Sequence, residues 1–205
     1  MLHAHPALSP SIILALTILI FSLADSRFFS TLTISLLLQQ TAVIALLAVG
    51  QTLIILTAGI DLSVGFIALL SMMVMAKLFA EQGWSSWLAI LAGILVGVAC
   101  GALNGVLVTG LNLPPFIATL GTMVAGKGVG LLFSQSIQIP FPKPVLDLGS
   151  TRLFGVIPLP IIIFGAVVLA AHLILTMTPL GRQIYAVGND SEAAKKAGLN
   201  VGRVL

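Results

Sequence analysis

The chain has 205 residues, of which 59% are hydrophobic and 7% are charged, and its mean hydropathy is +1.18. A soluble domain carries about a quarter charged residues, so this composition excludes a soluble globular protein and indicates one dissolved in a lipid bilayer. Nine basic and six acidic residues give a net charge of +3, which is too sparse to predict a nucleic-acid-binding surface. We therefore expect an all-α, polytopic integral membrane protein.

The apolar runs predict about six membrane-spanning helices, because one span needs about 20 apolar residues. The first is expected to be uncleaved, since no basic residue precedes it and no A-x-A cleavage site follows it. Residues 28–40 either form an interfacial helix or begin the second span, and the proline-containing stretch 134–160 predicts an extramembrane loop without regular helix. The expected spans lie roughly at residues 7–24, 40–58, 62–79, 88–108, 115–133 and 159–177.

The stretch AVGQTLIILTAGIDLSVG at residues 48–65 interrupts the apolar pattern, and its Asp61 is the one formal charge between Arg27 and Lys77. A charge within hydrocarbon is costly and needs a physical reason. In one interpretation Asp61 caps the third helix at a tight turn, accepting from backbone N–H groups two or three residues further on. In the other, the stretch is a break in a helix that lines a transport path, with Asp61 and Ser63 near that path.

Three further features lie inside the expected spans. Lys127 either extends to the headgroup region or lines a path and pairs with a carboxylate. Asn104 either forms a hydrogen bond between helices or contacts a substrate. Glycines at every fourth position of one span predict a groove for close helix packing: Gly93, Gly97, Gly101 and Gly105.

The final segment, residues 178–205, is polar and holds four of the nine basic residues, so the positive-inside rule places it in the cytoplasm. Six spans then place the N-terminus there too. Within this segment, Asn189 as N-cap and Glu192 three residues later form a predicted capping box. Gly198 fits the residue after the helix, so residues 189–198 predict a short helix that binds either a partner's groove or anionic lipid.

No pattern in the sequence predicts catalysis. The one cysteine, Cys100, lies within an apolar run and cannot form a disulfide within the chain. No His, Cys or Glu cluster has metal-ligand spacing, so neither a metal nor a cofactor is expected. The GKGVG stretch at residues 126–130 lacks the P-loop pattern. We expect a protein that is not an enzyme and has no ATPase of its own.

Several blocks of the sequence resemble the permease subunits of bacterial ribose/xylose/galactoside-type ABC importers, in the family's order and over nearly the whole chain. The resemblance identifies a monosaccharide permease in the bacterial inner membrane, with an ABC ATPase, a periplasmic sugar-binding protein and a second permease copy as partners. The blocks are LLAVGQTLIILTAGIDLSVG (46–65), GALNGVLV (101–108), LPPFIATLGTM (113–123) and TPLGRQIYAVGNDSEAAKKAGLNV (178–201).

The resemblance also implies specific roles for parts of the chain. Residues 1–205 correspond to the first six spans of a roughly ten-span, type II-like permease, and Asp61, Ser63, Asn104 and Lys127 become candidates for the translocation path. The segment at 189–198 is similar to the coupling helix that contacts the ATPase, and its candidate contact residues are Asn189, Asp190, Glu192, Ala193, Ala194, Lys195, Ala197 and Gly198.

Two other functions stay open at the level of the sequence. An ion-coupled secondary carrier would use Asp61 and Lys127 as its charged pair and would work without an ATPase. A remnant of a permease would fold or be degraded without transporting anything.

Overall fold

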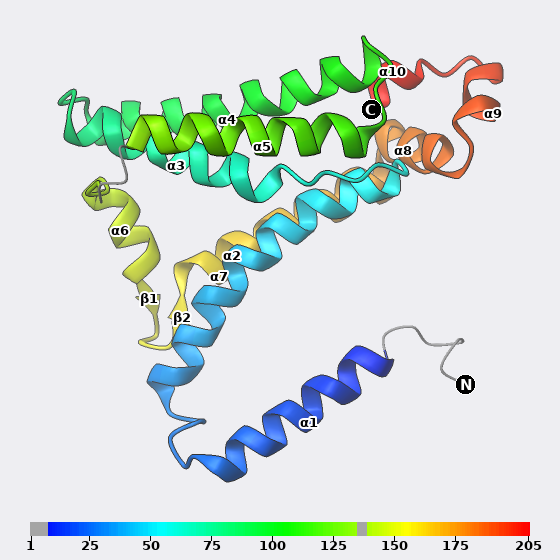
Figure 1. The fold of residues 1–205 in the computed structure, drawn as a ribbon. Helices are drawn as coiled ribbons and strands as arrows, with labels where there is room; N and C mark the ends of the chain where they lie inside the picture. The colour runs from blue at the N-terminus through cyan, green and yellow to red at the C-terminus, as the bar shows by residue number, and fades with distance from the viewer. Residues whose placement is uncertain (1–7, 135–138) are drawn as a thin grey trace.

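The computed structural model describes residues 8–134 and 139–205, and most of the described chain is helical (Figure 1). The sheet in this part of the chain is an antiparallel hairpin of two strands, in which Arg152 pairs with Pro158. In chain order the elements are α1 (Leu8–Ala24), α2 (Thr31–Leu56), α3 (Val64–Ala80), α4 (Ser86–Thr109), α5 (Pro115–Ser134), α6 (Lys143–Ser150), β1 (Arg152–Leu153), β2 (Ile157–Pro158), α7 (Leu159–Met177), α8 (Pro179–Asn189), α9 (Ser191–Lys196) and α10 (Val201–Val204).

The long helices form two groups. Helices α3, α4 and α5 pack side by side in one layer, and α2 packs along α7 in the other. Figure 1 shows the two groups converging at the end where α8 lies, while α6 and the hairpin connect α5 to the start of α7 at the opposite end. Helix α1 lies apart from both, and the ring of Phe21 stacks on Phe28 at a centroid distance of 6.1 Å.

Within the described residues, four helices are long and apolar enough to cross a membrane: α2, α4, α5 over Pro115–Phe133, and α7. Helices α1 and α3 are also apolar but have 17 residues each, at the lower limit of about 17–25 residues for a span. The six predicted spans therefore all form helices, four of them of full spanning length. The prediction that the second span begins at residue 40 is wrong, because α2 begins at Thr31.

The early start of α2 has a local cause. Ser30 is its N-cap, and the Ser30 Oγ accepts a hydrogen bond from the backbone N–H of Thr33 at 3.2 Å. The N-cap satisfies a backbone donor that would otherwise lack a partner at the helix start. Residues 31–40 thus belong to the second apolar helix, which decides between the two interpretations of residues 28–40.

The stretch 134–160 also differs from the prediction of a loop without regular helix. Its described part contains α6 and the β1–β2 hairpin. Proline does not prevent α6, because Pro144 occupies the first turn, where the missing N–H has no helical partner to lose. The turn of the hairpin holds Phe154 and Gly155 at positive φ, 53° and 73°.

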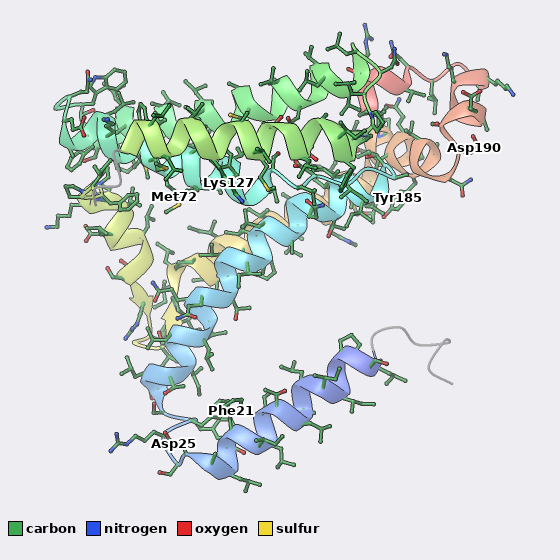
Figure 2. All side chains as sticks on the ribbon, viewed as in Figure 1. Phe21, Asp25, Met72, Lys127, Tyr185 and Asp190 are labelled. Carbon is green, nitrogen blue, oxygen red and sulfur yellow. The ribbon has the colours of Figure 1, made fainter. Side chains whose placement is uncertain are left out.

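Small residues occupy the interior, and large apolar residues point outward. Buried positions in the long helices include Ala42, Ala76 and Ala89, whereas Leu23 and Leu132 are about four-fifths exposed. Figure 2 shows side chains projecting from the outer faces of the helices. This distribution suits lipid as the surrounding medium, because helices in a bilayer gain little from burying leucine and associate through close backbone contact.

The glycine groove predicted on α4 makes contact along half of its length. A Cβ atom added to Gly93 would lie 3.0 Å from the Ser71 carbonyl of α3, and one added to Gly97 would lie 3.2 Å from the Ser71 Oγ. A Cβ atom added to Gly101 or Gly105 would meet no other atom within 4 Å. The first half of the groove therefore brings α3 and α4 together, and the second half faces open space in the described chain.

A separate glycine sets the contact between α3 and α5. The buried ring of Phe66 lies against Gly126 where a Cβ would have to stand, while Gly128, two residues further along α5, has open space at the same position. A methyl group at residue 126 would therefore force the ring away, and one at residue 128 would not.

We expect the Gly126→Ala variant to lose stability by about 1–3 kcal/mol, the usual cost of overpacking. The matched Gly128→Ala variant should keep the stability of the wild type or gain slightly, because alanine is the better helix former. Thermal unfolding of both purified variants in detergent measures the difference. Equal melting temperatures for the two variants would contradict the packing of Phe66 on Gly126.

Candidate functional site

Helix α2 ends in a turn, and the break that was predicted within residues 48–65 begins at this turn. The Ala58 N–H donates to the Ile55 carbonyl at 2.9 Å, and the Gly59 N–H donates to the Ile54 carbonyl at 3.0 Å. Ala58 adopts φ 60°, a left-handed conformation that costs a non-glycine residue about 1 kcal/mol. From there the chain runs without helical structure to α3, which begins at Val64 (Figure 1).

Asp61 holds this non-helical segment in shape. One carboxylate oxygen, Oδ1, accepts from both the backbone N–H and the hydroxyl of Ser63, each at 2.6 Å. The bond to an N–H two residues on agrees with the capping interpretation, but the N-cap position itself belongs to Ser63. Asp61 therefore orders the residues just before α3, and the break is a short, fixed segment between two helices.

Asn104 connects this segment to two further helices. Its Nδ2 donates to the Ser63 Oγ at 2.8 Å, and its Oδ1 accepts from the Thr122 hydroxyl at 2.6 Å. Ser63 and Asn104 are buried. Asn104 was expected either to form a hydrogen bond between helices or to contact a substrate. The structure contains the hydrogen bond between helices, and both ends of the amide already have protein partners.

Thr119 fixes the same segment from α5. Its hydroxyl oxygen accepts from the Leu62 N–H at 3.1 Å and lies 2.8 Å from the carbonyl of Pro115. Neither Thr119 nor Thr122 was among the residues predicted from the sequence to be functional. Their spacing of three residues places the two hydroxyls on one face of a helix. This spacing is the feature of the sequence from which a shared polar contact could have been predicted.

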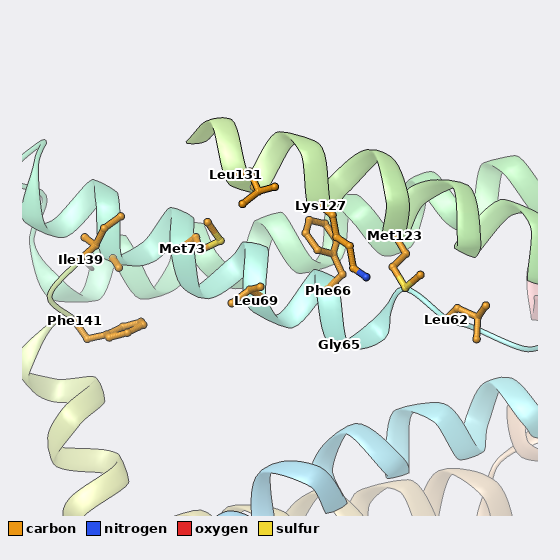
Figure 3. A pocket seen from close by; sticks show the side chains of 12 residues that line it. Leu62, Gly65, Phe66, Leu69, Met73, Met123, Lys127, Leu131, Ile139 and Phe141 are labelled. Atoms are coloured by element: carbon orange, nitrogen blue, oxygen red, sulfur yellow. The ribbon is translucent and has the colours of Figure 1, made fainter. Parts of the chain in front are cut away.

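Lys127 lies in a cavity of about 960 Å³ on the side of the α3–α5 layer that faces α2 (Figure 3). Its side chain is exposed there. The other lining residues are glycines or apolar residues: Leu62, Gly65, Phe66, Leu69, Met73, Ala76, Met123, Gly130, Leu131, Ile139 and Phe141. The cavity therefore contains one cation in an otherwise uncharged lining.

Asp61 and Lys127 do not form an ion pair. Within residues 8–134 and 139–205 the structure contains one salt bridge, between the Lys77 Nζ and the Glu81 Oε2 at 3.6 Å. Lys77 also donates to the carbonyl of Phe133 at 2.7 Å, so it ties the end of α3 to the end of α5. No group of three or more His, Cys, Asp or Glu side chains that could hold a metal lies in the part of the chain that the structure describes.

A second group of candidate residues lies at the end where the two helix groups converge. Helix α8 buries Gly181, Ile184 and Val187 on one face. Gly188 lies so close to the Leu56 carbonyl that no side chain would fit between α8 and the end of α2. This contact places the C-terminal segment beside the residues that lead into the break.

The short helix predicted at 189–198 forms, but its start is one residue later. Asp190 is the N-cap of α9 and accepts from the Ala193 N–H at 2.9 Å, whereas Asn189 is the last residue of α8. The predicted N-cap at Asn189 is therefore wrong. Gly198 has φ 87° and follows the helix as predicted, with the Leu199 N–H donating to the Ala194 carbonyl at 3.0 Å.

The faces of α9 divide its candidate residues. Ala194 is buried within this chain, while the side chains of Glu192, Ala193, Lys195 and Ala197 are exposed. A cleft of about 610 Å³ separates α9 and α10 from the turn after α4, and its lining includes Asn112, Glu192 and Lys195. The surface open to a partner is therefore polar and charged, with small residues between the charges.

We expect Ser63 and Asn104 to be energetically coupled. A double-mutant cycle of Ser63→Ala and Asn104→Ala should give a coupling of about 0.6 kcal/mol, with an upper range near 1.7, the values typical of hydrogen bonds between membrane helices. Unfolding in mixed micelles measures this coupling free energy.

A second cycle is the control. The losses of stability from Asn104→Ala and Thr17→Ala should add, because the Thr17 hydroxyl bonds within α1, to the Ile13 carbonyl. Additivity in both cycles would contradict the Ser63–Asn104 bond.

Comparison with known proteins places the chain in a family. The family model described as "Branched-chain amino acid transport system / permease component" matches residues 33–205. The fructose import permease protein FrcC of Rhizobium meliloti is 38% identical, over 100% of this chain and 59% of its own length. In Escherichia coli K12, the ribose import permease protein RbsC is 38% identical over 94% of this chain and 61% of its own, and the D-allose transport system permease protein AlsC is 39% identical over 92% and 58%.

This chain thus spans about three-fifths of the length of these curated relatives. No solved structure matches it significantly. The relatives confirm the resemblance to sugar-importer permeases that the sequence blocks indicated, and the apolar helices agree with a multi-pass membrane protein. The chain belongs to the family of transport-system permease components, whose members are parts of transporters rather than enzymes.

Proposed function

We propose that the chain is the permease subunit of a binding-protein-dependent ABC importer for a monosaccharide. The observation that carries the proposal is the match, over nine-tenths or more of the chain, to relatives named for fructose import, ribose import and D-allose transport. The family description names branched-chain amino acids, but these individual relatives are named for sugars. A separate ATPase, a periplasmic sugar-binding protein and a second permease copy are the partners that this function requires.

The cavity at Lys127 supports a path for a weakly held sugar. Its volume of about 960 Å³ is at the upper end of the roughly 300–1,000 Å³ of small-molecule sites. The rings of Phe66 and Phe141 can contact the apolar face of a sugar, and Lys127 can donate hydrogen bonds to its hydroxyls. One ammonium group, with three N–H donors and no acceptor, cannot satisfy all the hydroxyls of a sugar, so binding stays weak, as passage requires.

The segment 189–198 is the proposed contact for the ATPase. Asp190 and Gly198 fix both ends of α9, so the short helix is ordered without a partner. Gly188 packs on the end of α2, which leads to the break at residues 57–63. A movement of the ATPase would therefore reach the break through a direct backbone contact. A segment that contacts the ATPase lies in the cytoplasm, and six spans place the N-terminus there too. Residues 178–205 then form the cytoplasmic part of the single permease domain at 1–205.

Transport in vesicles tests the function. The chain would be reconstituted with a candidate ATPase and a candidate sugar-binding protein from the same genome, and uptake of labelled ribose, fructose and allose would be measured. We expect uptake of one sugar that requires ATP and the binding protein and that survives an ionophore. Uptake that an ionophore abolishes and ATP depletion spares would point instead to an ion-coupled carrier.

A bulky residue on the exposed side of α9 should weaken ATPase binding. We expect Ala193→Trp to reduce the ATPase recovered in co-purification about tenfold, which equals about 1.4 kcal/mol. Ala193 is exposed, whereas a bulky residue at Ala194 would disturb the chain's own packing. Ala80→Trp is the matched control, because Ala80 is an exposed alanine and the last residue of α3, a helix that ends far from α9 (Figure 1). Equal recovery with both variants would remove the contact from α9.

A further inference from the structure

Lys127 is a cation without a compensating charge inside the cavity. Of the other lining residues, none is ionisable, and in the described chain Lys127 forms no ion pair. The carboxylate of Asp61 is bound to Ser63 instead. Charged side chains within membrane helices are expensive, so an isolated one indicates a function.

Extension to the headgroups does not explain where Lys127 lies. It occupies the middle of the 20-residue helix α5, seven positions before the last residue, or about 10 Å along the axis. Helical side chains lean toward the N-terminus of their helix, which for Lys127 is away from the nearer end. Figure 3 shows its nitrogen below α5, on the side of Met123. The ammonium group therefore points into the cavity.

We propose that Lys127 is an electrostatic barrier that keeps cations out of the path while neutral sugars pass. The inference rests on the proposed function, because it takes the cavity to be part of that path. A fixed positive charge repels sodium ions and protons strongly where the surroundings are apolar, and a neutral sugar has no such cost. A cation that entered the path would be carried inward with the sugar, so a fixed positive charge there keeps the importer selective for the neutral substrate.

Ion selectivity in proteoliposomes tests the barrier. The assembled transporter would be reconstituted as the wild type, Lys127→Gln, Lys127→Arg and Lys143→Gln, and sodium and chloride fluxes would be measured in the same vesicles. We expect Lys127→Gln to raise the sodium-to-chloride permeability ratio about tenfold or more, and Lys127→Arg to keep the ratio of the wild type. Lys143→Gln removes the same charge from an exposed site on α6 outside the cavity, so it should change nothing.

The ratio separates electrostatics from packing. If Lys127→Gln raises sodium and chloride flux equally, Lys127 only fills space and the inference is overturned; an unchanged ratio overturns it too. Sugar uptake by the wild type, measured in the same preparation, reports on the proposed function separately. A changed ratio without any sugar uptake would leave Lys127 as an ion barrier and would reject the sugar path.

Discussion

The arrangement of α3, α4 and α5 depends on one buried amide, that of Asn104. Its two ends bind Ser63 at the start of α3 and Thr122 on α5, and Ser63 in turn binds Asp61. Lipid provides no hydrophobic force that presses helices together, so a few polar contacts and close backbone approaches decide how they are arranged. Because Asn104 binds both neighbours directly, the three helices share one hydrogen-bonded centre next to the break.

Glycine contacts complete what the hydrogen bonds begin. Gly93 brings α4 onto α3, Gly126 receives the ring of Phe66, and Gly188 brings α8 against the end of α2. The third contact holds α8 against the α2–α7 group at the end where the two groups converge. Under the proposed function, it also joins the ATPase-contacting segment to the break, so the part that would receive the movement lies next to the part that would transmit it.

Asp61 and Lys127 have separate roles in this structure. Asp61 is bound by Ser63 and orders the chain before α3, while Lys127 faces an apolar cavity. A charge-paired carrier would bring these two groups together, and here they have different surroundings. In the described chain, Asp61 and Lys127 therefore do not form the charge pair that an ion-coupled carrier would use.

The membrane class, the helical content and the approximate positions of the spans could be predicted from the amino-acid sequence, because these follow from the length and polarity of apolar runs. Gly198 could also be predicted from the sequence, since a residue at positive φ strongly favours glycine. Family membership followed from its blocks as well, because they hold their order along the chain.

The partners of the polar groups, in contrast, follow from how the helices pack. Asn104 and Ser63 are 41 residues apart, and no local pattern shows that they meet. Asn189 and Asp190 are equally good N-cap residues, and the choice of Asp190 depends on how far α8 continues. Whether Lys127 turned outward or toward a cavity was open for the same reason: the surroundings of a side chain in a membrane helix are set by the neighbouring helices.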